Sequence, residues 1–376
     1  METQRDTPTP FNPIAGDRLP GLDGLRAMGV LIVVLAHQGL APYGWIAVQM
    51  FFVLSGYLIT RLLWDARDQS LRDYLVGFYG RRSLRIFPLY FAVLLAFAVV
   101  AAFTTKGMLF KPALPYLATY TYNIWGTTDA YRESRYFSHF WSLCVEEQFY
   151  LLWPILIYLC RRDGVKQVLL GIVLLGPVIR LAEVLLLHSL PGANPLTYFA
   201  VYVSTPTYFD GFALGAYVAL FPLGGLRRAL FASLVLLAVT SYFALTSQQG
   251  VRDTSGMGPG YILIWGYSLV NLFSALLIDC LVFRKFAHGF FNARPLRYLG
   301  KISYGLYVFH LPVQTALEQV IPNSNLYARI AIQLVITITL SALSFRLLEK
   351  PFLLAKDRWF PTPAASAVLQ PIRAVE

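Results

Sequence analysis

Charged residues are scarce in this sequence. They make up 14% of the 376 residues, whereas hydrophobic residues make up 57%. A typical soluble domain carries about 25% charged residues, so an ordinary soluble protein is excluded. Apolar runs recur along the chain, and a run of about 20 residues is long enough to cross a bilayer as a helix. The sequence therefore predicts an all-α bundle of transmembrane helices.

Cysteine is also rare, with only Cys144, Cys160 and Cys280. All three lie in or beside apolar runs and share no metal-ligand spacing, so we interpret them as small hydrophobic side chains. No metal or cofactor is expected. A cleavable signal peptide is lacking too, because the first 20 residues are polar and proline-rich. The first hydrophobic helix is therefore expected to direct insertion.

The apolar runs predict ten spans with both termini in the cytoplasm. This orientation places 24 of the 31 basic residues inside and six outside, with Arg180 in mid-span. The segment 113–126 is short and rich in Thr, Tyr and Pro, and we interpret it as re-entrant or extracytoplasmic. The net charge of +11 then reflects cytoplasmic loops rather than binding to nucleic acid. The predicted spans are 24–42, 45–62, 87–104, 139–160, 167–188, 198–221, 229–246, 260–283, 301–320 and 328–348.

The expected domain organisation follows from these spans. Residues 1–17 form a disordered cytoplasmic tail, residues 18–351 the membrane domain, and residues 352–376 a second cytoplasmic tail. No soluble catalytic domain fits between the spans, so any chemistry is expected within the bundle.

Four ionisable residues fall near mid-membrane in this topology. At about 1.5 Å per residue, His37, Glu146, Asp210 and His310 lie about 12–18 Å along their helices from one predicted end of the span. Such groups are costly in lipid and mark functional sites by default, so the pattern suggests a polar cavity. His310 equally suits a structural bond between helices, and Asp210, which precedes Gly211, suits pairing with a backbone amide.

Glu146 and Glu147 are adjacent carboxylates that point about 100° apart on a helix. We expect one to face the cavity and the other to pair with a cation. Ser142 precedes Glu146 by one turn and is expected to bond to it, with a direct catalytic role as the alternative.

Motifs in order along the chain resemble the acyltransferase-3 family of membrane acyltransferases. The stretch from Arg18 to Arg26, followed by ten residues and His37, resembles the start of that family, and the segment 51–59 resembles its second helix. Arg82 and Arg85 fit its Arg-x-x-Arg motif. The segments 140–150, 303–310 and 348–351 resemble its Ser-x-x-x-Glu segment and its last two helices. The family's common hydrolase-like domain is absent, so the chain resembles the stand-alone form.

The resemblance implies transfer of an acyl group, usually acetyl, from cytoplasmic acyl-CoA to a hydroxyl of a carbohydrate or glycolipid in the bacterial inner membrane. A hydroxyl that attacks a thioester needs a base, and neutral imidazole suits that role near pH 7. His37 is the expected base, with Glu146 and Glu147 as further catalytic candidates. Transfer can be direct or pass through an acyl-histidine.

Arg82 and Arg85 share one helical face and are expected to bind CoA phosphates, with ordinary inside charge or lipid head groups as the alternative. Asp23 and Arg26 are one turn apart, so Arg26 either pairs with Asp23 or helps to hold the donor. Ser55 and Gly56 suit close helix packing.

Two other classes of function compete with an enzyme. A transporter or flippase also has about ten spans and midplane polar groups, but it typically shows an inverted repeat, and we find none. A receptor or scaffold has no need for buried His and Glu at matched depth.

Overall fold

The described part of this computed structural model is built from helices. It comprises residues 20–41, 44–103, 107–128, 131, 133–189, 196–223, 231, 232, 235, 238 and 262–361. Within these residues there is no β-strand. The expected tail at residues 1–17 lies outside them, as does almost all of the predicted span 229–246.

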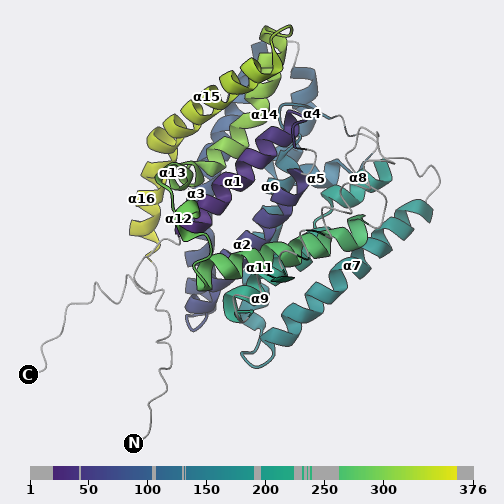
Figure 1. Ribbon diagram of the computed structural model, residues 1–376, viewed down its shortest axis with the longest axis vertical. Coiled ribbons are helices and arrows are strands. Elements are labelled where there is room, and N and C mark those ends of the chain that lie inside the picture. The colour runs from purple at the N-terminus through teal and green to yellow at the C-terminus, as the bar shows by residue number, and fades with distance from the viewer. Residues whose placement is uncertain are drawn as a thin grey trace, which may run out of the picture.

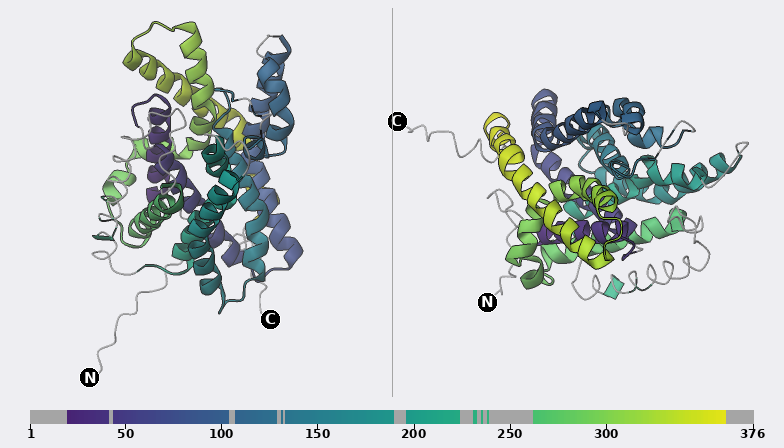
Figure 2. Two further views of the ribbon diagram at one scale, coloured as in Figure 1. Left: turned by 90° about the vertical axis from the view of Figure 1, so that its right-hand side faces the viewer. Right: turned by 90° about the horizontal axis from the view of Figure 1, so that it is seen from above.

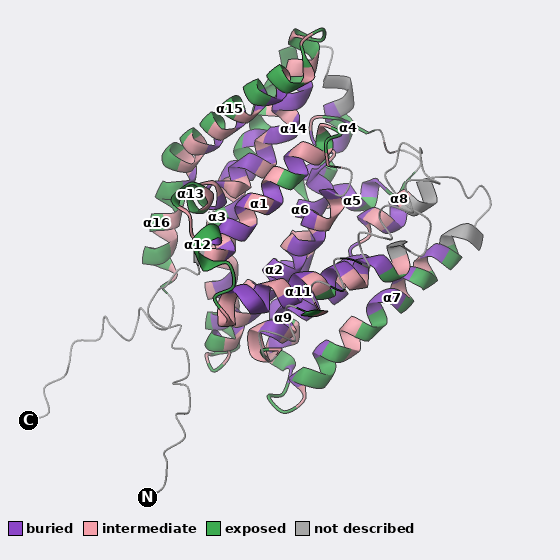
Figure 3. Cartoon of the chain, viewed as in Figure 1, coloured by how far each residue is buried: buried purple, intermediate pink, exposed green. Residues whose placement is uncertain are grey.

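Five helices form the centre of the bundle (Figure 1). Figure 3 shows α1, α2 and α6 as mostly buried or half-buried, whereas exposed residues gather on α7, α15 and α16. The apolar side chains of these outer helices therefore face the surroundings, as expected of a bundle surrounded by lipid. The central helices are α1 (Pro20–His37), α2 (Gly44–Ala66), α6 (Phe140–Leu159), α9 (Phe209–Leu220) and α11 (Tyr267–Phe283).

The outer helices enclose this centre. α15 and α16 follow one edge and α7 the opposite edge, as the views in Figure 2 also show. A π-helical turn, η3 (Phe345–Glu349), joins α15 to α16. The outer elements are α3 (Leu71–Phe103), α7 (Val165–Ser189), α15 (Leu326–Ser344) and α16 (Lys350–Trp359), whereas α14 (Ser303–Val320) packs against both α15 and α1.

The remaining elements are short. α4 (Gly107–Ala118) has 12 residues, or about 18 Å of helix, too short to cross a bilayer. Together with α5 (Tyr122–Trp125) it occupies the segment expected to be re-entrant or extracytoplasmic. The other short elements are α8 (Leu196–Val203), η1 (Pro206–Tyr208), η2 (Ile262–Gly266), α12 (His288–Phe291) and α13 (Arg294–Lys301).

Five described helices are long and apolar enough to cross a membrane, and the chain is an integral membrane protein. They cover Gly44–Ala66, Leu71–Phe103, Val165–Leu186, Ile264–Phe283 and Leu326–Trp359. The count of ten spans and the cytoplasmic placement of both termini stay predictions.

Two predicted boundaries differ from the structure. α3 begins at Leu71, 16 residues before the predicted start of its span, and helix continues through α16 to Trp359, inside the expected C-terminal tail. With 33 residues, α3 is about 50 Å long, so it extends well beyond the thickness of a hydrocarbon core.

The predicted span 198–221 is not one continuous helix. It is divided into α8, η1 and α9, because Pro206 lacks the N–H that an uninterrupted helix needs there. Side chains satisfy carbonyls at the break: Asn123 donates to the Val203 oxygen at 3.1 Å, and Thr207 donates to the Val201 oxygen at 2.9 Å. Breaks of this kind are tolerated in membranes when such partners are present.

A buried ion pair ties α7 to α9. Arg180 and Asp210 are both fully buried and form two bonds, of 3.0 and 2.8 Å. Ser268 and Asn271 of α11 donate to the same carboxylate at 2.8 and 3.0 Å. The amide of Gly211 also donates to Asp210 at 2.9 Å, so the carboxylate pairs with a backbone amide, as expected, as well as with Arg180. Asp210 thus joins three helices.

α2 packs closely against α9 through two glycines. A Cβ at Gly56 would lie 2.0 Å from the Phe212 carbonyl oxygen, and one at Gly215 would lie 1.9 Å from that of Val53. The small side chains therefore allow the backbones to approach, as expected for Gly56.

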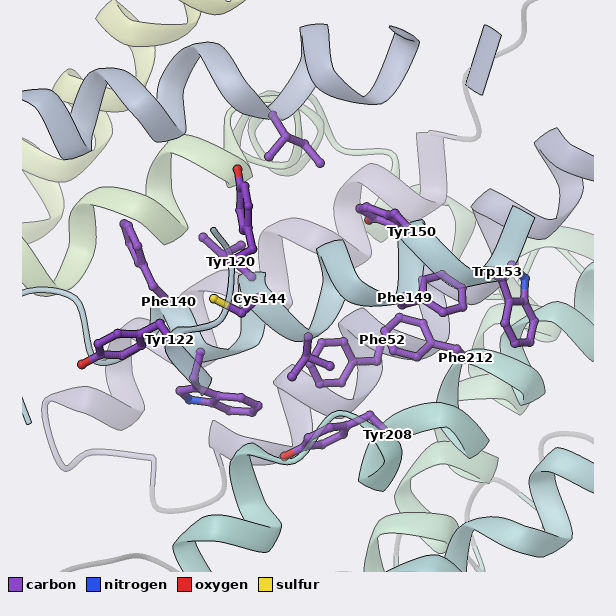
Figure 4. Packing of buried hydrophobic residues seen from close by; sticks show 14 of the residues in the cluster. Phe52, Tyr120, Tyr122, Phe140, Cys144, Phe149, Tyr150, Trp153, Tyr208 and Phe212 are labelled. Carbon is purple, nitrogen blue, oxygen red and sulfur yellow. The ribbon is translucent and has the colours of Figure 1, made fainter. Parts of the chain in front are cut away.

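Aromatic rings fix α6 against this pair of helices. The ring of Phe149 stacks on that of Phe212, with centroids 3.7 Å apart, and the Phe52 ring lies 5.1 Å from the Phe212 ring. Figure 4 shows these three side chains together, with Tyr150 on the next position of α6. The cluster sets the position of α6 and hence of its glutamates.

Candidate active site

A cavity lies among α1, α2, α3, α6 and α14. It holds about 970 Å³ of empty space, including solvent at its mouth. Both polar and apolar side chains line it. They are Arg26, Val48, Phe51, Phe52, Leu54, Ser55, Leu58, Arg82, Arg85, Ile86, Ser142, Leu143, Glu146, Glu147, Tyr150, Ser303, Tyr304 and Tyr307.

Three arginines line this cavity. Arg82 and Arg85 are one turn apart on α3, as the sequence predicted, because α3 continues as a helix through the segment expected to be a loop. The Arg82 guanidinium lies 4.3 Å from the centre of the Tyr150 ring, and its buried Nε has no hydrogen-bond partner. Arg26 pairs with Asp23 at 2.8 Å and also lines the cavity.

Glu146 and Glu147 both line the cavity, which differs from the expectation that only one would face it. Glu146 accepts hydrogen bonds from the hydroxyls of Ser55 and Tyr150. Glu147 has a buried oxygen, Oε1, without a hydrogen-bond partner. Although three arginines line the same cavity, no ion pair within 4.0 Å joins Glu147 to a cation within the described residues.

Ser142 does not bond to Glu146 in the structure. Its hydroxyl donates to the His139 carbonyl oxygen at 3.1 Å and lies 2.5 Å from the Tyr307 hydroxyl. Tyr307 comes from α14, 165 positions away in sequence, and its hydroxyl also donates to the His139 carbonyl at 3.0 Å. A cross-helix partner therefore replaces the predicted one within α6.

His37 is the last residue of α1 rather than the middle of a span. Its side chain is exposed and is not part of the cavity lining. Nδ1 lies 2.9 Å from the Val33 carbonyl, and Gln314 donates to the His37 carbonyl at 2.8 Å. His37 lies eleven positions after Arg26, so the helix places it about 16 Å beyond the cavity arginine.

His310 is fully buried on α14, and its ring centroid lies 5.0 Å from that of His37. Of the four mid-membrane residues, only Glu146 lines the cavity, His37 and His310 pack together, and Asp210 belongs to the buried ion pair. These four residues therefore lie in three separate environments and not in the single polar cavity that their depths suggested.

Sequence reasoning missed several polar residues of the site. Tyr150, Tyr304 and Tyr307 line the cavity, and Ser55, interpreted as a packing residue, bonds to Glu146. Tyr150 stands four residues after Glu146, so helical spacing could have indicated it. Tyr307 pairs across helices, and no local pattern indicates that.

The arrangement suits an anionic ligand with a long neutral arm. Guanidinium groups bind phosphates through paired hydrogen bonds, and the cavity behind them is mixed in polarity. No group of His, Cys, Asp or Glu within the described ranges is arranged to hold a metal ion.

Comparison with known proteins gives a family. The model of the acyltransferase-3 family, described as an acyltransferase domain, matches residues 19–347. The chain is similar to O-acetyltransferase OatA of Staphylococcus aureus strain NCTC 8325, with 28% identity over 360 residues. It is similar to putative peptidoglycan O-acetyltransferase YrhL of Bacillus subtilis, with 28% identity over 351 residues, and to peptidoglycan O-acetyltransferase OatA of Listeria monocytogenes, with 28% identity over 360 residues.

Each alignment covers 89% of this chain but only 57%, 54% and 55% of the respective relative. The chain thus spans little more than half the length of these proteins. No solved structure matches it.

Proposed function

Because the chain belongs to the acyltransferase-3 family, we propose that it is a membrane O-acetyltransferase, with acetyl-CoA as donor and a carbohydrate hydroxyl as acceptor. The three relatives carry O-acetyltransferase in their names, and two of those names specify peptidoglycan. The site is proposed to lie in a bacterial inner membrane with the arginine end of the cavity toward the cytoplasm.

The observation that carries the proposal is the convergence of Arg26, Arg82 and Arg85 on one cavity. Acetyl-CoA bears several phosphate charges at one end and a thioester at the other. Its phosphates would bind the three guanidinium groups, and its neutral arm would enter the cavity. The partnerless Nε of Arg82 supplies a free donor for this contact.

The acidic side of the cavity has a separate role in the proposal. Glu146 holds the hydroxyls of Ser55 and Tyr150 by accepting from both, so it fixes two groups that can contact the arm of the donor. Glu147, with one partnerless oxygen, is the carboxylate available to a bound ligand.

His37 is the proposed base. Because Nδ1 faces a carbonyl oxygen, the neutral ring carries its proton there and presents Nε2 as the acceptor. Nε2 takes the proton of the acceptor hydroxyl as its oxygen attacks the thioester carbon. A C–O bond forms, the C–S bond breaks, and the CoA thiolate leaves and is protonated.

The acceptor is proposed to be a lipid-linked or surface glycan, a class that includes peptidoglycan strands. In the predicted topology α1 runs outward, so His37 lies on the outer side of Arg26. This arrangement favours a donor from the cytoplasm and an acceptor from outside.

The test is transfer of label by the purified full chain. We expect radiolabelled acetyl from acetyl-CoA to appear as a base-labile ester on one fraction of an extracted bacterial glycan mixture. The double variant Arg82→Ala, Arg85→Ala, assayed in the same way, should transfer far less acetyl label at low acetyl-CoA concentration. Absence of labelled ester on every glycan fraction, with well-folded protein, would contradict the proposed function.

A further inference from the structure

The Arg82 guanidinium is held by an aromatic ring and not by a carboxylate. Its central carbon lies 4.3 Å from the centre of the Tyr150 ring, which belongs to α6. Tyr150 is buried, with an exposed fraction of 3%. No ion pair in the described part of the chain includes Arg82, whereas Arg26 in the same cavity is paired with Asp23. The two arginines therefore differ in the kind of partner that fixes their position.

An aromatic partner leaves the charge of a guanidinium available to a ligand. The face of a tyrosine ring attracts a cation through its π electrons, but it carries no net negative charge that would neutralise the cation. A carboxylate partner would instead occupy two N–H donors and cancel the charge. The contact with Tyr150 can thus orient Arg82 without using the groups that bind a phosphate.

The Tyr150 ring is itself fixed by its neighbours. Its hydroxyl donates to Oε1 of Glu146, one turn earlier on α6, and the Ser55 hydroxyl of α2 donates to the same oxygen. These bonds set the direction of the ring axis. Rotation about that axis is limited by Phe78 of α3, whose ring meets the Tyr150 ring at 73° with centroids 6.4 Å apart. The ring is therefore held in the orientation that places Arg82 over its face.

Hydrogen bonds between α3 and α6 determine which residue of α3 meets this ring. The Tyr79 hydroxyl donates to the Leu151 carbonyl oxygen at 2.8 Å, and the Tyr74 hydroxyl donates to that of Pro154 at 3.0 Å. A later residue of α3 thus contacts an earlier residue of α6, so the two helices run antiparallel here. The next contact in this series is that of the guanidinium with the ring.

Arg82, Tyr150 and Glu146 all line the cavity, so this series of contacts ends where the donor is proposed to bind. We propose that Glu146 and Tyr150 are positioning residues for the donor. Glu146 fixes the Tyr150 hydroxyl, the ring holds the Arg82 guanidinium, and Arg82 binds a phosphate of acetyl-CoA. Binding is favoured because the guanidinium does not have to be ordered when the ligand arrives. The inference rests on the proposed function and deepens it, since it assigns Glu146 to donor binding through Tyr150 and not to proton transfer.

Removal of the ring should act mainly on donor binding. Tyr150→Leu takes away the face that holds Arg82, so we expect the Kd for acetyl-CoA to rise about tenfold, the order of a desolvated cation–π contact. Calorimetric titration of the purified full chain measures this change. The effect on kcat at saturating acetyl-CoA should be much smaller than the effect on Kd. An unchanged Kd, or a loss confined to kcat, overturns the proposal.

A double-mutant cycle shows whether the effect of the ring passes through Arg82. Once Arg82→Ala has removed the guanidinium, adding Tyr150→Leu should raise the Kd by less than about twofold. Independent effects would multiply, so a full further loss in the double variant overturns the proposal. Tyr158→Leu is the matched control, because Tyr158 lies on α6 outside the cavity lining and packs against Tyr74. It should bind acetyl-CoA as the wild type does.

Tyr150→Phe tests the part of Glu146, because it keeps the ring and removes the hydrogen bond to the carboxylate. We expect the Kd for acetyl-CoA to rise about threefold, less than in Tyr150→Leu, as for the loss of one hydrogen bond. A Kd equal to that of the wild type overturns the role of Glu146. A Kd equal to that of Tyr150→Leu overturns the role of the ring face.

The same titrations separate this inference from the proposed function. Wild-type protein that binds no acetyl-CoA contradicts the proposed function itself. A wild type that binds acetyl-CoA, with independent effects of Arg82 and Tyr150, overturns only the positioning role. If Tyr150→Leu does not fold, Tyr150→Phe carries the same comparison, and its smaller loss should disappear when Arg82→Ala is also present.

Discussion

Arg82 and Arg85 lie one turn apart on α3, and both line the cavity. We expect replacement of either by Ala to weaken acetyl-CoA binding by about 1.5–3 kcal/mol, since each would remove hydrogen bonds to a charged phosphate. Calorimetric titration measures the change directly. Arg72→Ala is the matched control, because Arg72 is exposed near the start of the same helix. Equal acetyl-CoA affinity in the double variant and the control would show that the two arginines do not bind the donor and serve only as positive charge on the cytoplasmic side.

His37 is expected to act in the chemical step and not in donor binding, since it stands outside the cavity lining. In His37→Asn the amide can keep the bond to the Val33 carbonyl while the basic nitrogen is lost. Turnover should fall by about 10²–10⁴-fold, and the acetyl-CoA affinity should be that of the wild type. Near-normal turnover in this variant would remove His37 from the mechanism.

At the residue scale, the sequence predicted the site residues that belong to motifs. It did not predict the residues that join the site only through contacts between helices. Arg26, Arg82, Arg85, Glu146 and Glu147 were predicted as site residues and all line the cavity. The partners of these residues were harder to predict. Ser142 was assigned to Glu146 by helical spacing, whereas its partner is on another helix, and the position of a distant helix is not encoded in local spacing.

The buried ion pair of Arg180 and Asp210 holds α7, α9 and α11 together. Its loss should therefore lower the stability of the helix bundle without removing a catalytic group. Asp210→Asn removes the negative charge and leaves Arg180 buried without compensation. We expect it to lower the free energy of unfolding by about 3–5 kcal/mol, with a lower Tm for the purified protein.

The exposed pair of Arg162 and Asp68 provides the control for that prediction. Its atoms lie 2.8 Å apart, but the side chains are 65% and 79% exposed. Asp68→Asn should therefore change stability by less than about 1 kcal/mol. Similar Tm values for Asp210→Asn and Asp68→Asn would show that the buried pair does not stabilise the bundle.

At the element scale, hydrophobic runs predicted where helices lie better than where they end. The apolar run of α3 begins near position 87, but its helix begins at Leu71, because Arg and Tyr residues continue a helix without extending the apolar run. The opposite error occurred at 198–221. There the apolar run continues past Pro206, so it predicts one unbroken span. The helix is nevertheless interrupted, because proline has no backbone N–H to donate.

For the whole molecule, the distribution of basic residues predicts that both termini are cytoplasmic. A periplasm-dependent reporter such as alkaline phosphatase should therefore be inactive when fused after residue 376. The same reporter inserted in the segment 104–106, on the predicted outer side, should be active. Activity of the terminal fusion would overturn the ten-span topology and the side assigned to CoA.

The predicted topology and the site geometry agree on one direction through the bundle. Arg26 is near the start of α1 and His37 at its end, about 16 Å apart along the helix. His139, next to His310 and close to His37, stands before α6, which is predicted to run inward from the outer side. In the predicted topology, the arginines thus belong to the inner half and the histidines to the outer half.

In this orientation, the donor is proposed to enter from the cytoplasm and the acceptor from outside. Sealed vesicles of known orientation test it, with labelled acetyl-CoA and a membrane-impermeant glycan acceptor supplied on chosen faces. We predict transfer when acetyl-CoA is on the cytoplasmic face and the acceptor is on the opposite face. Transfer only when both substrates are on the cytoplasmic face would contradict the claim.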